Sequence, residues 1–403
     1  MRLPDGEPVP ADGALPEPAL AGAGRRGFGI YVHVPFCASR CGYCDFNTYT
    51  AAELGSGVSR ESYPELVLSE LALAARVLAD IPPPRVDTVF FGGGTPTLLD
   101  PDDLARILAA VDAAFGLAPG AEVTTEANPE SVGEADLRRL RRAGFTRVSL
   151  GMQSTAPHVL RVLDRQHRPG RAAAAAADAR RAGFDHVNLD LIYGTPGERA
   201  EDFAASLQAA VDAGADHVSA YALIVEDGTA LAARIRRGEL AAPDDDVAAD
   251  RYLAADAALG AAGFDWYEVS NWARSPAARC RHNLRYWTGG DWWGLGPGAH
   301  SHIGGVRWWN VKHPAGYASR LAGGRSPGHA REVLTGPQRR TEEVMLRLRL
   351  ADGLPLAGLP AAAAARAVAD GLLAADAYRS GRAVLTLRGR LLADAVVRSL
   401  VDW

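Results

Sequence analysis

The sequence predicts an α/β fold in which strands and helices alternate along most of the chain. From Gly27 onward, short runs of β-branched and aromatic residues alternate with Ala-, Leu- and Arg-rich runs of helical period. Several helical runs end in the same way, at Gly144, Gly183, Gly214 and Gly263, and glycine suits the left-handed residue that terminates a helix. Six or more such units predict a parallel sheet that forms a closed or nearly closed barrel.

Each expected element follows from its local pattern. The expected strands are residues 29–34, 87–92, 121–127, 147–153, 186–194 and 217–225, with 265–270 as a weaker seventh. The helices expected between them include residues 64–81, 100–116 and 133–144.

Polar residues follow the expected strands at the point where each strand ends. A cysteine-rich loop follows the first strand and a run of three glycines follows the second. The later strands end on or near Glu126, Asn128, Gln153, Asp190 and Tyr221. Because the carboxyl ends of parallel barrel strands meet at one rim, we expect a single site there.

The composition is that of a soluble globular protein, with 48% hydrophobic and 23% charged residues. The net charge of −5 gives no basic field that would attract nucleic acid. Residues 1–26 are rich in Pro and Ala and lack the pattern of a signal peptide, so we expect a disordered tail. No run is apolar enough for a membrane span, and four cysteines do not make a disulfide framework, so we expect a cytoplasmic protein.

Three of the four cysteines, Cys37, Cys41 and Cys44, lie within eight residues. They could bind zinc, bind an iron–sulfur cluster, or be plain buried thiols. A structural zinc site needs four ligands, and only Cys280 could complete an all-cysteine set. A [4Fe–4S] cluster with three cysteines keeps one iron open for another ligand, and three thiols in one loop favour this interpretation.

Longer motifs then resemble a known family. The CxxxCxxC loop with Tyr43 before its last cysteine is similar to the signature of the radical S-adenosylmethionine proteins. "YVHVPFC", "FFGGGTPT", "NLDLIYGTPG" and "RHNLRYW" resemble the branch of oxygen-independent coproporphyrinogen III oxidases and related proteins. This resemblance implies a partial (β/α)6, TIM-like barrel over residues 27–270, a Trp- and Gly-rich extension over 271–330, and a small winged-helix-like α+β domain over 331–403.

The resemblance also implies the roles of individual residues. The three cysteines would hold the [4Fe–4S] cluster, whose open iron would take the amino and carboxylate groups of S-adenosylmethionine. The implied contacts to S-adenosylmethionine are Tyr31, Gly93, Gly94, Thr95, Glu126, Gln153, Arg165 and Asp190. No catalytic residue is assigned, and the sequence leaves open whether the protein turns over a substrate.

Two functions compete within this branch. The oxidases carry a further cysteine where this chain has Phe46, whereas haem chaperones of the HemW type share the HNxxYW motif found at residues 282–287. The resemblance makes His282 the candidate haem ligand, and seven tryptophans between Trp266 and Trp309 could face a porphyrin. We expect a haem chaperone; the alternative is a coproporphyrinogen III dehydrogenase that forms protoporphyrinogen IX.

The expected partners follow from that function. They are haem or a porphyrin, haem-accepting proteins and a reductant for the cluster, with no nucleic acid. Peripheral membrane contact and a homodimer are compatible with the sequence. In the C-terminal domain we expect a helix, a short hairpin at 382–389 and a final helix, packed over the barrel.

Overall fold

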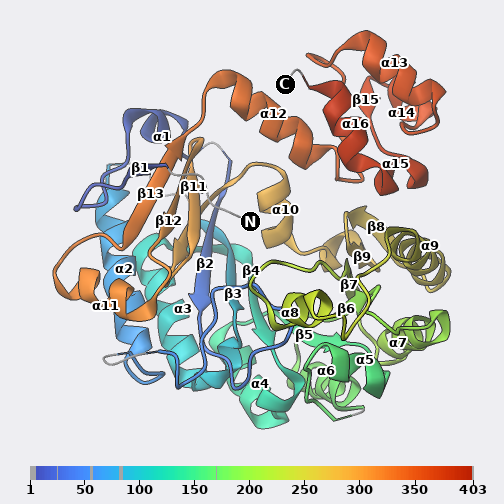
Figure 1. Cartoon of the computed structure of the whole chain (residues 1–403). Helices are drawn as coiled ribbons and strands as arrows, with labels where there is room; N and C mark the ends of the chain where they lie inside the picture. The colour runs from blue at the N-terminus through green and yellow to red at the C-terminus, as the bar shows by residue number, and fades with distance from the viewer. Residues whose placement is uncertain (1–5, 25, 55–57, 81–84, 169, 402–403) are drawn as a thin grey trace.

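A mostly parallel sheet forms the centre of the molecule (Figure 1). The computed structural model describes residues 6–24, 26–54, 58–80, 85–168 and 170–401. Six adjacent parallel strands form the barrel part of this sheet. They are β2 (Phe28–Val34), β3 (Val86–Gly93), β4 (Leu117–Ala127), β5 (Arg147–Gln153), β6 (His186–Tyr193) and β7 (His217–Ala222).

These strands are buried on both faces, as parallel strands covered by helices must be. In β2 every residue except Tyr31 is buried, and Ile30 and Val32 are fully enclosed. Ile30 lies in register with Val89 on β3, which in turn lies in register with Val123 on β4. The apolar runs seen in the sequence therefore form one continuous core.

Helices connect the strands, and most of them lie along the outer face of the sheet. They are α2 (Tyr63–Val77), α3 (Pro101–Phe115), α4 (Glu134–Ala143), α5 (Pro157–Val162), α6 (Arg171–Ala182), α7 (Ala200–Asp212), α8 (Ala230–Arg236) and α9 (Asp245–Ala261). The 3₁₀ turns η1 (Pro96–Leu98) and η2 (Pro129–Ser131) follow β3 and β4. The expected terminators Gly144, Gly183, Gly214 and Gly263 all have positive φ, between 73° and 110°, because only a residue without Cβ adopts this conformation freely.

The predicted partial barrel is confirmed: the described strands form an open sheet with two distinct ends. At one end β7 pairs with β9 (Asn271–Ala273), which pairs with β8 (Asp265–Glu268), both antiparallel. The weaker seventh strand therefore exists, as an antiparallel edge strand.

The extension expected over residues 271–330 does not form a separate unit. After η3 (Pro276–Ala278) and α10 (Arg281–Trp287), strand β10 (Asp291–Leu295) pairs in parallel with β2. Antiparallel strands β11 (His300–Ile303), β12 (Val306–Asn310) and, beyond α11 (Pro314–Ala322), β13 (Gly328–Val333) continue the same sheet. The expected boundary between residues 330 and 331 falls inside β13. Local sequence could not reveal this, because the pairing joins segments far apart in the chain.

The disordered tail expected over residues 1–26 is also wrong for its described part. Strand β1 (Glu7–Pro8) pairs with β13, and Glu7 forms an ion pair with Arg331 at 2.6 Å. Helix α1 (Glu17–Gly22) places Gly22 against Gly304, where an added Cβ would lie 2.8 Å from the Gly304 Cα. Long-range pairing orders a segment whose composition alone predicts disorder; residues 1–5 and 25 lie outside the described part.

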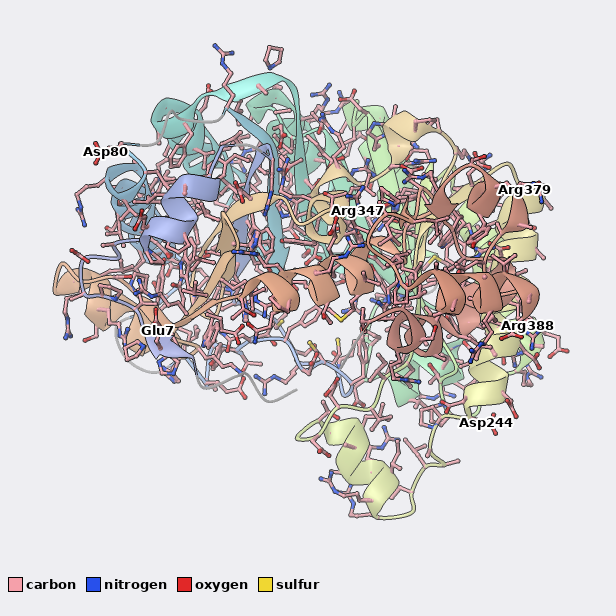
Figure 2. All side chains as sticks on the ribbon, turned by 90° about the horizontal axis from the view of Figure 1, so that it is seen from above. Glu7, Asp80, Asp244, Arg347, Arg379 and Arg388 are labelled. Atoms are coloured by element: carbon pink, nitrogen blue, oxygen red, sulfur yellow. The ribbon has the colours of Figure 1, made fainter. Side chains whose placement is uncertain are left out.

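The C-terminal segment forms a small unit with its own apolar core. Its elements are α12 (Gly336–Arg347), β14 (Leu354–Pro355), α13 (Ala361–Ala369), α14 (Ala375–Arg379), β15 (Arg382–Ala383), α15 (Leu387–Leu391) and α16 (Ala393–Leu400). The hairpin expected at 382–389 does not form: β15 pairs with β14 instead, and residues 387–391 are helical. Figure 2 shows Arg388 and Arg379 of this unit on the side of the molecule away from Glu7 and Asp80.

Several contacts attach this unit to the barrel part. Arg390 of α15 binds Asp256 of α9 through both of its terminal nitrogens, at 2.8 and 3.1 Å, and lies 4.3 Å over the ring of Trp266. Leu350 forms a β-bridge with Glu268 of β8. Among the described helices, none has the length and apolar character that a membrane crossing requires.

Candidate functional site

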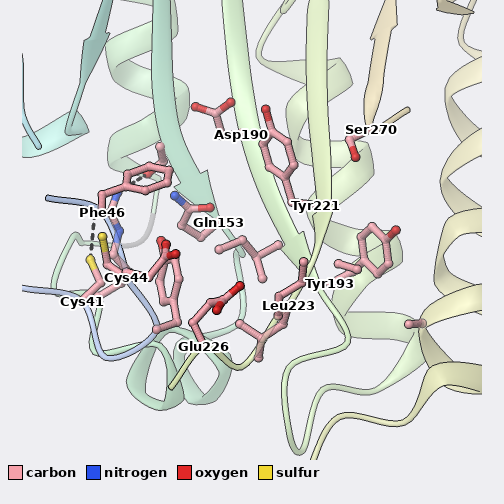
Figure 3. A pocket seen from close by; sticks show the side chains of 18 of the residues that line it. Cys41, Cys44, Phe46, Gln153, Asp190, Tyr193, Tyr221, Leu223, Glu226 and Ser270 are labelled. Atoms are coloured by element: carbon pink, nitrogen blue, oxygen red, sulfur yellow. Dashed lines mark hydrogen bonds between the residues drawn. The ribbon is translucent and has the colours of Figure 1, made fainter. Parts of the chain in front are cut away.

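A cavity of about 1430 Å³ lies at the carboxyl ends of the parallel strands. Ten residues proposed from the sequence line it: Cys37, Cys41, Cys44, Gly93, Gly94, Thr95, Glu126, Gln153, Arg165 and Asp190. Asn128 and Tyr221, which also end strands, line it as well. Figure 3 shows Gln153, Asp190 and Tyr221 projecting from the strands toward a space that Cys41 and Cys44 border from the other side. The structure thus brings together Cys37 and Tyr221, which are 184 positions apart.

The cysteine loop is held in place by backbone hydrogen bonds at its base and in its middle. The N–H of Cys37 donates to the carbonyl of Tyr49 at 3.0 Å, where the loop leaves β2. In the middle of the loop, the N–H of Gly42 donates to the carbonyl of Leu163 at 3.2 Å, and its carbonyl accepts from the N–H of Leu231 at 2.8 Å. The loop is therefore clamped between the end of α5 and α8, so its thiols keep fixed positions relative to the strands.

The three thiols suit a cluster better than a single ion. All three cysteines are partly exposed in the cavity and form no disulfide. Among the described residues, no three His, Cys, Asp or Glu side chains are grouped to hold one metal ion, which a zinc site would require. A four-iron cluster binds each thiolate at a different iron, so its ligands need not converge on one point.

Burial favours the protonated form of two of the three thiols when no cation is bound. Burial raises the pKa of Cys44 to about 11 and also raises that of Cys37. The guanidinium of Arg165 lies beside the third thiol, and its Nη1 donates to the Cys41 sulfur at 3.3 Å. Such thiols become thiolates when a metal binds them, and binding then releases protons.

The glycine turn after β3 forms a narrow cradle beside the cysteine loop. Gly93 has a φ of 108°, and a Cβ added there would lie 2.6 Å from the ring of His33. A Cβ added to Gly94 would lie 2.4 Å from the carbonyl oxygen of Phe36. The backbone itself therefore lines this part of the cavity and can offer its polar groups to a ligand.

Two partly buried carboxyls, Glu126 and Asp190, face the cavity from β4 and β6. Burial, with repulsion from Asp190, raises the pKa of Glu126 to about 8, and its Oε2 accepts from the N–H of Gly93 at 3.0 Å. Burial also raises the pKa of Asp190, which accepts from Ser149 at 2.8 Å and Asn188 at 2.7 Å. Such a pair favours a bound cation or hydroxyl donors, because either relieves the repulsion between the two acids.

Unsatisfied polar atoms and backbone strain gather at the same place. The buried Oε1 of Gln153 and Nε of Arg165 have no hydrogen-bond partner among the described residues. Among those residues, three other than glycine have positive φ: Gln153, Asp164 and Ser270, at 63°, 52° and 86°. Gln153 and Ser270 line the cavity, and Asp164 follows the α5 end that clamps the cysteine loop. Strain and unpaired polar groups of this kind mark a ligand site.

Two of the proposed residues, Tyr31 and His282, do not line the cavity. The hydroxyl of Tyr31 shares a hydrogen bond with His33 at 3.0 Å. His282 is buried, and its ring nitrogens bond to Thr88 at 2.9 Å and Tyr286 at 2.8 Å. Burial lowers the pKa of His282 to about 3. Its role as a haem ligand stays a prediction, and it requires the ring to leave one of these partners.

The tryptophan-rich segment packs into the core and away from the cavity. Trp272, Trp293, Trp308 and Trp309 are buried, and no tryptophan lines the cavity among the described residues. The sequence interpretation of these rings as a porphyrin face is therefore wrong for this cavity. Cys280 is buried too, with its thiol donating to Glu122 at 3.7 Å, away from the three loop cysteines.

The structure adds lining residues that the sequence did not indicate. The C-terminal unit contributes Arg388, Leu391 and Leu392, and the segment after β7 contributes Ile224 and Glu226. No motif marks them, and only the docking of the C-terminal unit on the barrel brings the two segments to one cavity. Helix α8, which follows this second segment, projects from the body of the molecule at the bottom of Figure 2.

Comparisons with known proteins show which family the chain resembles. Residues 31–210 match the model of the Radical SAM superfamily. Two "Heme chaperone HemW" proteins of Mycobacterium tuberculosis strains are each 60% identical over 95% of this chain and 97% of their own length. The "Heme chaperone HemW" of Escherichia coli K12 is 35% identical, with 81% and 83% covered. The solved structure of the E. coli coproporphyrinogen III oxidase HemN matches with a TM-score of 0.80, 24% identity, and 94% and 91% coverage, which supports the fold alone.

The open barrel and its three-cysteine loop at the strand ends define a radical SAM protein. That superfamily implies a [4Fe–4S] cluster and S-adenosylmethionine, and the donor set described above fits both. Within the superfamily, the chain belongs to the HemW family of haem chaperones.

Proposed function

We propose that this protein is a haem chaperone, which binds haem and passes it to haem-accepting proteins. The observation that carries the proposal is the 60% identity, over nearly the full length, to proteins named "Heme chaperone HemW". The expected features of that branch are present in this chain: Phe46 in the loop and the HNLRYW segment at residues 282–287.

Cys37, Cys41 and Cys44 would hold the cluster. When bound, the cluster supplies an open iron for S-adenosylmethionine and a path for one-electron reduction. The chain's own residues bind and orient the cofactor: Glu126 and Asp190 offer acceptors to its ammonium and hydroxyl groups. The Arg165 guanidinium can pair with a carboxylate.

The alternative, a coproporphyrinogen III dehydrogenase, has less support. The oxidases of the branch carry a further cysteine at the position of Phe46, and the likeness to HemN at 24% identity concerns the fold. The structure assigns no catalytic residue for such a reaction. The cytoplasmic location, the reductant, the homodimer and the peripheral membrane contact stay predictions from the sequence.

Haem transfer tests the proposal. Anaerobically reconstituted protein is loaded with haemin and mixed with an apo haem protein, and the acceptor's own absorption bands are followed. We expect transfer faster than from free haemin. In parallel, the protein is incubated with coproporphyrinogen III, S-adenosylmethionine and dithionite; a decarboxylated product there would support the dehydrogenase and contradict a purely chaperone role.

A further inference from the structure

The cavity is larger than one small cofactor needs. Its volume of about 1430 Å³ exceeds the range of about 300–1000 Å³ that is usual for ligand pockets. The polar groups expected to hold S-adenosylmethionine gather around the ends of β3 to β6, next to the cysteine loop. Room therefore remains on the outer side of the cavity for a second ligand.

That outer part exposes large apolar side chains. Ile224 is 67% exposed, Phe46 61%, Leu392 43% and Tyr221 41%, and all four line the cavity. Ten large apolar residues are exposed within the described part of the chain, and these four all border the same cavity. Clustered exposed apolar groups mark a binding site, because leaving them in water is unfavourable.

The four residues come from three separate walls. Phe46 lies in the cysteine loop, Tyr221 and Ile224 lie at and beyond the end of β7, and Leu392 lies between α15 and α16 of the C-terminal unit. A ligand that contacts all of them must be broad and apolar. The two aromatic rings can stack on a conjugated plane.

The charges at this end restrict how an anionic ligand could lie. Arg388 forms no ion pair with any residue that the structure describes, and it donates only to the carbonyl of Asp370, at 3.0 Å. Arg390 is neutralised by Asp256. Asp245 and Asp246, at the start of α9, also line the cavity and repel carboxylates. Carboxylates on the ligand would therefore point toward Arg388.

We infer that the outer part of this cavity, bordered by Phe46, Tyr221, Ile224, Leu392 and Arg388, is the haem-binding site. The inference rests on the proposed function and locates its ligand. Haem then lies over S-adenosylmethionine in one shared cavity, with its propionates toward the C-terminal unit. His282, which is enclosed elsewhere in the barrel, is not a haem contact in this arrangement.

Haemin titration of the full-length, cluster-loaded protein, followed by absorbance, tests the site. Ile224→Glu and Leu392→Glu place a charge on two different walls, and Met345→Glu, on the exposed face of α12 away from the cavity, is the matched control. We expect each cavity variant to raise the Kd by at least about tenfold, equal to about 1.4 kcal/mol, and the control to match the wild type. The iron–sulfur absorbance shows that each variant is folded and loaded.

A second arm tests the carboxylate contact. Arg388→Gln should weaken haemin binding but not binding of haemin dimethyl ester, whereas Arg379→Gln, an exposed arginine already paired with Asp376, should change neither. Unchanged haemin affinity in both cavity variants, with loss in His282→Ala, would overturn the site and leave the chaperone proposal standing. No saturable haemin binding by the wild type would overturn the proposed function itself.

Discussion

The Nη1 of Arg165 lies 3.3 Å from the sulfur of Cys41, while its Nη2 donates to the carbonyl of Gly151 at 2.9 Å. One guanidinium thus joins the cysteine loop to the end of β5. From the sequence, Arg165 was the proposed cofactor contact farthest from any strand end. The turn after α5 carries it back into the cavity.

Removal of this guanidinium should weaken cluster retention. A hydrogen bond to a charged group contributes about 1.5–3 kcal/mol, so Arg165→Ala should shift the equilibrium between loaded and apo protein by about tenfold or more. Iron and sulfide content after gel filtration measures this. Arg161→Ala, an exposed arginine on α5 four residues earlier, is the control, and equal iron content in both variants would show that Arg165 does not support the cluster.

Gly94→Ala should disrupt the cradle beside the cysteine loop. The added methyl would lie 2.4 Å from the Phe36 carbonyl oxygen, so two backbone segments must separate. Overpacking of this kind costs about 1–3 kcal/mol, and we expect a lower melting temperature and weaker S-adenosylmethionine binding. Gly260→Ala in α9 is the matched control, because its Cβ would meet nothing within 4 Å and alanine favours a helix. Wild-type behaviour of Gly94→Ala in both assays would rule out the tight cradle.

Glu268→Gln should reduce the loss of stability at alkaline pH. Burial raises the pKa of Glu268 to about 8, from 4.5, so folding favours its protonated form. The resulting stabilisation is complete below about pH 4.5 and is lost as the pH rises through about 8. The amide cannot ionise, so the melting temperature of Glu268→Gln relative to wild type should rise between pH 5 and pH 9. Glu201→Gln, on the exposed side of α7, should follow the wild type; a parallel curve for Glu268→Gln would contradict the raised pKa.

Arg390→Ala should loosen the C-terminal unit. The guanidinium is bound to Asp256 at 2.8 and 3.1 Å and stacked over Trp266, so its loss removes a partly buried anchor. We expect faster amide hydrogen exchange in α15 and α16, with the exchange of β2 to β6 unchanged. Arg388→Ala, which lacks these contacts, should leave exchange as in the wild type. If amide exchange in Arg390→Ala also matches the wild type, this contact does not hold the C-terminal unit in place.

The strands and helices of the barrel could be predicted because their signals are local. Within a few residues, the apolar runs around Ile30 and Val89 predict strands. In the same way, Gly144 and Gly183 predict the ends of helices. Ten of the twelve proposed site residues meet at the cavity, and for nine of them the reason is the same: each lies near the end of a strand or in a motif next to one, whereas Arg165 returns through the turn after α5.

The structural features that could not be predicted from the sequence depend on contacts between distant segments. Strand β10 pairs with β2, more than 250 residues away, and Glu7 pairs with Arg331 at the far edge of the sheet. Nothing local marks such partners. The surroundings of His282 could not be predicted for a similar reason, since the motif around it is visible in the sequence but its hydrogen bonds with Thr88 and Tyr286 are not.

The cluster in the cysteine loop is the central claim, and metal and sulfide analysis tests it most directly. Anaerobically reconstituted wild type and Cys280→Ala, whose buried thiol lies outside the cavity, should each hold about four irons and four acid-labile sulfides per chain. Cys41→Ala should hold neither in that amount. Zinc without sulfide in the wild type, or a full cluster in Cys41→Ala, would contradict the account.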